Sequence, residues 1–183
     1  MLEIINMKKL TILLFSIFIS VSSYADYQDG QDAYDRGDYK AAFNEWQSLA
    51  EQGDVEAQTR LGRMYRVGEG VEEDYKEAIK WYTKAAEQGN IAAQFELGYM
   101  YEWGNGPLKD PKEAVKWYTK AAEQGYAATQ YLLGIMYIEG KGVLKDLSKA
   151  KYWIMKTYEN PEVSPGLVKA AEKTWNIFEL WNY

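Results

Sequence analysis

The ten residues KWYTKAAEQG occupy positions 80–89 and occur again, without a change, at positions 116–125. The two copies lie 36 residues apart, and AEQG at positions 50–53 lies 36 residues before the AEQG that ends the first copy. Self-similarity at a fixed period of this length is the sequence signature of a helical repeat protein. The chain therefore predicts a solenoid built from copies of one unit.

Further residues obey the same offset. Each of the following recurs 36 and again 72 residues later: Leu61-Gly62, Met64-Tyr65, Gly68, Gly70, Asp74, Ala78 and Trp81. Within the first of these units Ala57, Leu61, Met64 and Tyr65 lie at i, i+4, i+7 and i+8, a spacing typical of an amphipathic helix. The first helix of each unit is predicted at Val55–Val67, Ile91–Trp103 and Ala127–Glu139, and the paired glycines end it.

The second helix of each unit begins at an aspartate. Asp74 and Asp110 are followed three residues later by Glu77 and Glu113, the pattern of a capping box. Asp146 has Lys149 at that position, which predicts a weaker cap. Glycines at positions 89 and 125 are predicted to end this helix.

A glycine in the middle of the first helix recurs at positions 62, 98 and 134. Glycine in a helix interior costs about 1 kcal/mol relative to alanine. The repeated glycine therefore predicts a close approach of two helices, with a large Trp or Tyr of the second helix filling the space.

The whole chain is predicted to be all-α, a single repeat domain at 26–183 behind a signal peptide. Within the domain we expect a degenerate unit at 26–53, full repeats at 54–89, 90–125 and 126–160, and a capping helix at 161–183. The last helix is predicted to run from Pro165-Gly166 to about Trp181, with Phe178 on its apolar stripe.

Residues 1–25 have the features of a secretory leader. Lys8 and Lys9 precede an apolar run at 10–21, and Ser23 and Ala25 provide small residues for cleavage before Asp26. Met7 is an alternative start, and a retained membrane anchor is the alternative to a cleaved leader. Without cysteine, neither disulfides nor a lipid anchor can form. We expect a soluble periplasmic or secreted protein, with a monomer favoured.

Composition argues against several function classes. The chain has a net charge of −6, and loss of the leader would leave 19 basic and 26 acidic residues, so nucleic acid is a poor partner. It has neither histidine nor cysteine, which removes the commonest general base and zinc ligands. The acidic turn Glu72-Glu73-Asp74 lacks the spacing of a calcium loop. We expect no catalytic residues, no metal and no cofactor.

The pattern AQxxLGxMYxxGxGVxxDxxxAxxWYxxAAEQG at 57–89 resembles the Sel-one-like repeat (SLR), a relative of the tetratricopeptide repeat. The resemblance covers nearly all of 33–158 and implies a right-handed α/α superhelix whose first helices line a concave face that binds proteins or peptides. It implies no enzyme activity, and the chain cannot belong to the cysteine-rich branch. Its departures are Pro107 for Val71, Ile154 for Tyr82, and Thr157-Tyr158 for Ala85-Ala86, which suggest that the last unit packs differently.

The candidate binding residues are those that vary between repeats while facing the same way. They are Arg63, Arg66, Phe95, Tyr99, Trp103, Tyr131, Ile135 and Ile138, with Thr59, Val67, Glu102 and Glu139 beside them. Exposed aromatic and arginine side chains are the usual anchors of protein interfaces. The alternative is that these side chains pack against neighbouring helices or under the terminal helix.

These observations favour an exported scaffold that binds a protein or peptide partner in the groove formed by the first helices. The alternative is a periplasmic inhibitor or immunity protein that blocks a toxin or an envelope enzyme. An enzyme acting on cell-wall glycan is a third class, and it would require turnover by the purified protein.

Overall fold

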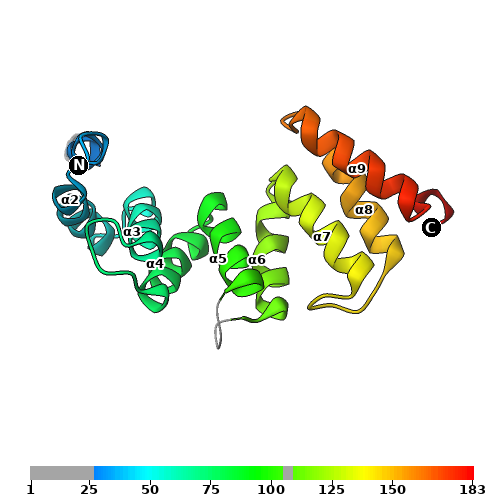
Figure 1. Ribbon diagram of the computed structural model, residues 1–183, viewed down its shortest axis with the longest axis horizontal. Coiled ribbons are helices and arrows are strands. Elements are labelled where there is room, and N and C mark those ends of the chain that lie inside the picture. Colours follow the sequence, from blue (N-terminus) through cyan, green and yellow to red (C-terminus); the bar gives the residue numbers. More distant parts are fainter. Residues whose placement is uncertain (1–26, 105–108) are drawn as a thin grey trace, which may run out of the picture. The chain divides into compact units, whose positions relative to one another are not determined.

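The computed structural model describes residues 27–104 and 109–183, which fold into α-helices and one short 3-10 helix with no strand in those ranges (Figure 1). Residues 27–35 are helical. The elements that follow are α2 (Tyr39–Glu51), α3 (Val55–Val67), α4 (Tyr75–Glu87), α5 (Ile91–Trp103), α6 (Pro111–Glu123), α7 (Ala127–Glu139), α8 (Leu147–Tyr158), α9 (Pro165–Ile177) and η2 (Leu180–Asn182). The predicted all-α class is confirmed, and the three predicted first helices agree with α3, α5 and α7. The leader, its cleavage site and Pro107 lie outside the described residues.

The chain divides into two compact units, the first ending at Trp81 and the second beginning at Tyr82, so that the boundary lies within α4. In the first unit α2 packs against α3. In the second unit each helix from α5 to α9 packs against the next one along the chain. The prediction of a single repeat domain stays a prediction.

The core of the first unit forms around the fully buried Trp46. The rings of Tyr27 and Tyr34 lie 5.9 Å and 5.6 Å from it, measured between centroids, and the Arg60 guanidinium lies 5.4 Å from its ring centre. A side chain at Gly30 would overlap the Trp46 indole. The degenerate N-terminal unit therefore keeps the helix pair, with one tryptophan filling the space that the glycine leaves.

In the second unit the mid-helix glycines lie where two helices approach closely, as predicted. A methyl group at Gly98 would overlap the Tyr118 ring, with Cγ at 2.9 Å. One at Gly134 would lie 2.5 Å from Ile154 Cδ1, so an isoleucine fills the space in the last repeat where Trp or Tyr was expected. The glycines are therefore explained by packing between the two helices of a repeat.

The predicted capping boxes form only in part. The carboxylates of Asp74, Asp110 and Asp146 accept hydrogen bonds from backbone N–H groups in the first turn of the second helix. The N–H of each aspartate does not bond to the glutamate: it donates instead to the carbonyl of the repeat's tyrosine, at Tyr65, Tyr101 or Tyr137. Glu77 and Glu113 pair with lysines one turn along the helix. The glutamate does not complete the capping box because a backbone carbonyl of the preceding helix already accepts the hydrogen bond of each aspartate N–H.

Buried amides join successive helices. The Nε2 groups of Gln58, Gln94 and Gln130 donate to carbonyls in the last turn of the preceding second helix, at Ala50, Ala86 and Ala122, each over 3.1 Å. In the second unit, Gln124 donates to Gln94 Oε1 and Asn160 donates to Gln130 Oε1. These bonds satisfy carbonyls that a helix end leaves open, so the glutamines have a structural role.

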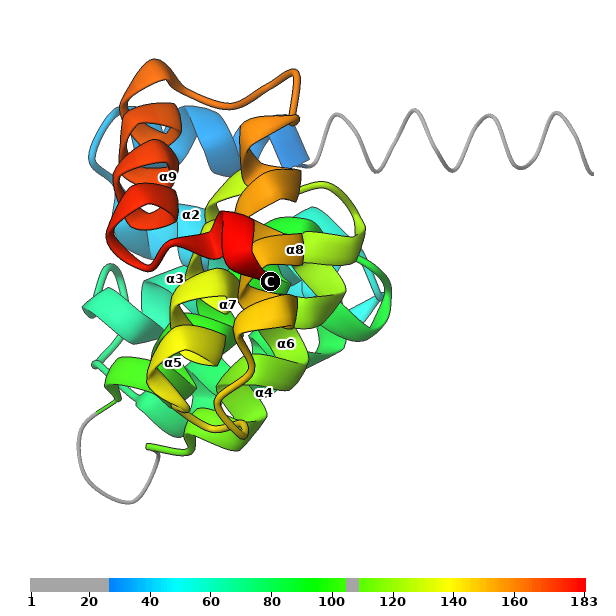
Figure 2. The same cartoon turned by 90° about the vertical axis from the view of Figure 1, so that its right-hand side faces the viewer.

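The C-terminal helix is shorter than predicted. It ends at Ile177, Glu179 adopts φ 49°, and η2 folds back against α8 and α9 (Figure 2). Leu180 is thereby fully buried among Ile138, Ala150, Ile154 and Ala171. Burial of a leucine contributes about 1.5–3 kcal/mol, enough to offset the roughly 1–2 kcal/mol of a left-handed residue. Phe178, predicted on the buried stripe, is exposed.

Candidate protein-binding surface

A row of aromatic side chains lies on α5. Phe95, Tyr99 and Trp103 are four residues apart, and Phe95 is half-buried while Tyr99 is 45% and Trp103 58% exposed. The Phe95 ring lies 6.4 Å from Tyr99 and 5.4 Å from Tyr126, measured between centroids. We name these four residues the α5 aromatic surface. Contiguous exposed apolar area on a protein surface often marks an interaction site, and aromatic side chains are enriched among the anchors of protein interfaces.

Sequence reasoning missed Tyr126. It occupies the N-cap position of α7, where α5 has Asn90, and its side chain makes no capping hydrogen bond. An aromatic side chain cannot cap a helix. A tyrosine at a position whose repeat counterparts are polar capping residues was therefore the signal that could have identified it.

A buried charge network supports Trp103. The Glu102 carboxylate is buried and accepts hydrogen bonds from the Tyr118 hydroxyl, over 2.9 Å, and from Lys141 Nζ, over 2.7 Å. Lys141 Nζ in turn lies 4.2 Å from the centre of the Trp103 ring. Glu102 had been expected at the edge of the groove, beside the candidate residues. Because its charge is buried and paired, it fixes Lys141, and Lys141 orients the exposed indole.

The environment of Tyr118 makes its hydroxyl a weaker acid than that of a free tyrosine. Burial raises the pKa of Tyr118 far above its ordinary value of 10.0, and the negative charge and hydrogen bond of Glu102 raise it further. In the folded chain the hydroxyl therefore stays protonated at pH values where a free tyrosine ionises, and it remains the donor to Glu102 there. Burial also raises the pKa of Tyr34, Tyr65 and Tyr101.

The raised pKa of Tyr118 in the folded chain predicts that the protein loses stability at alkaline pH. Above about pH 10 the unfolded chain releases the Tyr118 proton while the folded chain keeps it, so the free energy of unfolding falls as pH rises, by up to about 1.4 kcal/mol per pH unit for this group. Urea unfolding followed by circular dichroism between pH 9 and 11 should show a smaller fall in Tyr118→Phe than in the wild type. In the variant the free energy of unfolding should still fall somewhat with pH, because the pKa values of Tyr34, Tyr65 and Tyr101 are also raised. Equal slopes in the two proteins would contradict the assignment.

The candidate residues on α7 lie under the C-terminal elements. Ile138 is buried in the core with Leu180, which corrects the expectation that it faces a groove. Tyr131 and Ile135 are half-buried against the same cluster, and the Tyr131 hydroxyl lies 3.1 Å from Thr174 Oγ1. The reason is that α9 and η2 cover this part of α7. For these three residues the structure agrees with the packing alternative.

Arg63 and Arg66 lie on α3 in the first unit. Arg63 is exposed, and its guanidinium lies 5.7 Å from the centre of the Tyr34 ring. Arg66 is half-buried in the last turn of the helix. In the same unit, Thr59 is half-buried and its hydroxyl donates to the Val55 carbonyl within α3. Thr59, Arg63 and Arg66 belong to the first unit, whereas the α5 aromatic surface belongs to the second unit.

Residues 27–104 and 109–183 contain no group of three or more acidic side chains placed to hold a metal ion. No helix in these ranges has the length and apolar character that crossing a membrane requires.

Comparison with known proteins agrees with this geometry. The model of the Sel1 repeat matches residues 55–90, 91–126 and 127–156, more than half of the chain. A Sel1 repeat protein from Oxalobacter formigenes is 39% identical with a TM-score of 0.66, over 73% of this chain and 55% of its own.

A protective antigen of uropathogenic Escherichia coli strains, which displays an SLR fold, is also 39% identical, with a TM-score of 0.71 over 82% of this chain. The present chain spans about half of the first of these proteins and 33% of the second. No curated protein matches it. The three consecutive repeats and their shared register place the chain in the Sel1 repeat family.

Proposed function

We propose that the protein is an exported scaffold that binds a protein or peptide partner on the α5 aromatic surface. Sel1 repeats are in general units of protein–protein interaction. The observation that carries the finer proposal is Trp103, 58% exposed yet held by Lys141 and, through it, by the buried Glu102. A large side chain that is already oriented loses little entropy on binding, so it can contribute strongly to affinity.

The α5 aromatic surface favours a partner with apolar side chains. Tyr99, Trp103 and Tyr126 together offer aromatic rings and two phenolic hydroxyls, and the ammonium of Lys141 lies beside them. An apolar segment with an acidic residue next to it would complement this surface. The predicted leader would direct the chain to export, so the partner in this proposal is an envelope or extracellular protein.

Substitution of Tyr99 and Trp103 by alanine tests the proposal. Loss of two central aromatic anchors is expected to weaken partner binding at least about tenfold, or about 1.4 kcal/mol. The purified protein would be immobilised and used to capture partners from envelope and culture fractions, followed by affinity measurement with each captured protein. A partner held by the wild type and lost by the double variant would support the proposal.

The matched control is Tyr75→Ala/Tyr152→Ala, which removes two exposed tyrosines from second helices. It should bind the partner as the wild type does, and both variants should keep the wild-type helical content. Equal capture by all three proteins would place binding outside the α5 aromatic surface. A captured toxin, together with loss of protection when the gene is deleted, would favour the inhibitor or immunity alternative.

A further inference from the structure

The terminal helix α9 keeps the register of the first helices in the inner repeats. The N-caps of α5, α7 and α9 are Asn90, Tyr126 and Ser164. Positions 7, 8, 11 and 12 after the cap carry Leu97, Gly98, Tyr101 and Glu102 in α5, and Leu133, Gly134, Tyr137 and Ile138 in α7. All of these are buried or half-buried. The second helix of the same repeat packs on this face, with Tyr118 against Gly98 and Ile154 against Gly134, and Leu180 completes the burial of Ile138.

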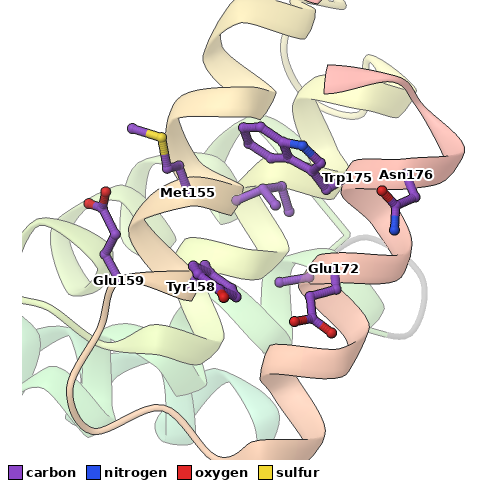
Figure 3. A pocket seen from close by; sticks show the side chains of 8 residues that line it. Met155, Tyr158, Glu159, Glu172, Trp175 and Asn176 are labelled. Carbon is purple, nitrogen blue, oxygen red and sulfur yellow. The ribbon is translucent and has the colours of Figure 1, made fainter. Parts of the chain in front are cut away.

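In α9 the same four positions carry Ala171, Glu172, Trp175 and Asn176, and no second helix covers them in the described part of the chain. Ala171 is buried in the cluster that contains Leu180, Trp175 packs against that cluster and is half-buried, and Glu172 and Asn176 are exposed. The four residues line a pocket of about 500 Å³ together with Ile154, Met155, Tyr158 and Glu159 (Figure 3). This end pocket is therefore the place that the second helix of a further repeat would occupy, which indicates an α-helix as its occupant.

The chemistry of the end pocket differs from that of the inner junctions. Its lining includes the buried apolar side chains of Ile154 and Ala171. The aromatic side chains of Tyr158, from α8, and Trp175, from α9, also line it (Figure 3). The carboxylates of Glu159 and Glu172 lie at its edge, and neither forms an ion pair with another described residue.

One cation also lies near the end pocket. Lys151 Nζ is 5.8 Å from the centre of the Trp175 ring. This contact shows that the indole accepts an ammonium as a neighbour. The residues that line the pocket include the two carboxylates and no cationic side chain, so the lining carries a net negative charge.

Glu172 decides how closely a helix can approach. In the inner repeats glycine at this position lets Tyr118 or Ile154 pack against the backbone of the first helix. A glutamate excludes that contact, so a docking helix must reach the apolar lining with a long side chain. Lysine and arginine combine an aliphatic stem, which packs on aromatic walls, with a charge that pairs with a carboxylate.

A second copy of the chain is a poorer occupant. Contact between two copies of the same end would place Glu159 and Glu172 of one copy near those of the other. Repulsion between like charges at such an interface costs affinity. Charge complementarity therefore favours a basic partner.

We propose that the end pocket binds an amphipathic helix of a partner protein, which inserts a lysine or arginine beside Tyr158 and Trp175 and pairs it with Glu172 and Glu159. The helix takes the place beside α9 that α6 and α8 have beside α5 and α7. This interaction is independent of the α5 aromatic surface, because no residue that lines the end pocket belongs to that surface.

Two designed helical peptides test the proposal, one with a leucine stripe flanked by lysines and the other with glutamate in place of each lysine. Fluorescence anisotropy with the purified protein is expected to show at least about tenfold tighter binding of the lysine peptide, and the preference should weaken in high salt. Glu172→Lys should lower affinity for the lysine peptide about tenfold or more. Glu159→Lys should act in the same direction.

Glu123→Lys is the matched control, because Glu123 is exposed on α6 at the position that Glu159 has one repeat later. It makes the same change of charge away from the end pocket and should leave affinity unchanged, as should Tyr99→Ala/Trp103→Ala. Equal binding of the two peptides, unchanged binding by Glu172→Lys, or an equal loss in Glu123→Lys would overturn the proposal. So would a dimer in sedimentation that Tyr158→Ala dissociates, which would assign the pocket to a second copy.

Discussion

Replacement of Gly142 by alanine is expected to lower the free energy of unfolding by about 2–4 kcal/mol. Gly142 has φ +72°, a conformation that strains any residue with a Cβ. A methyl group there would also lie 2.5 Å from the Pro111 carbonyl carbon and 3.0 Å from Lys112 N, closer still to the Pro111 oxygen. Because these are backbone atoms at the start of α6, they cannot rotate away, and the whole loop would have to move.

The loop also carries Lys141, so its movement should weaken the contact of that lysine with Glu102. Urea unfolding measured by circular dichroism gives the stability of each variant. Gly125→Ala is the matched control, because Gly125 has φ +91° but no atom within 4 Å of the added methyl group. It should cost only about 1 kcal/mol. Similar losses in the two variants would show that backbone conformation, and not the contact with Pro111, explains Gly142.

Leu180→Ala is expected to lower the free energy of unfolding by about 2–5 kcal/mol. Leu180 is fully buried among residues of α7, α8 and α9, so its truncation leaves a cavity where four side chains meet. Loss of this contact also removes the compensation for the left-handed conformation of Glu179. We expect η2 to detach first, with increased hydrogen exchange in α9, before the rest of the second unit unfolds.

Leu144→Ala makes the same chemical change at a leucine that is 90% exposed. Its free energy of unfolding should stay within about 0.5 kcal/mol of the wild type. If Leu180→Ala were equally harmless, η2 would contribute nothing to the core. The helix would then be free to continue through Trp181, as the apolar pattern alone predicted.

The period of 36 residues was enough to predict most of the fold. It predicted the bounds of α3, α5 and α7, because the same apolar positions and the same terminal glycine recur in each of these three helices. It also gave the reason for Gly98 and Gly134, since an unfavourable residue that recurs at one position implies a packing requirement. The bond partner of each capping aspartate could not be read in this way, because that acceptor comes from another helix.

The candidate site was predictable only on α5. The spacing of Phe95, Tyr99 and Trp103 places them on one helix face. The same reasoning placed Ile138 and Tyr131 on an equivalent face of α7, where the structure buries the first and half-buries the second. Periodicity fixes the direction of a side chain relative to its own helix, but exposure depends on what lies opposite.

The sequence by itself therefore determined the repeat, the helices, the family and the absence of histidine and cysteine chemistry. Only the tertiary structure decided which faces stay exposed, the pairing of Glu102 with Tyr118 and Lys141, and the end pocket beside Glu172. The physical reason is that these features join residues from different elements that are far apart in the sequence. Glu102 is 16 residues from Tyr118 and 39 residues from Lys141. They depend on the non-repeating C-terminal segment and on loop contacts, for which a repeat period carries no information.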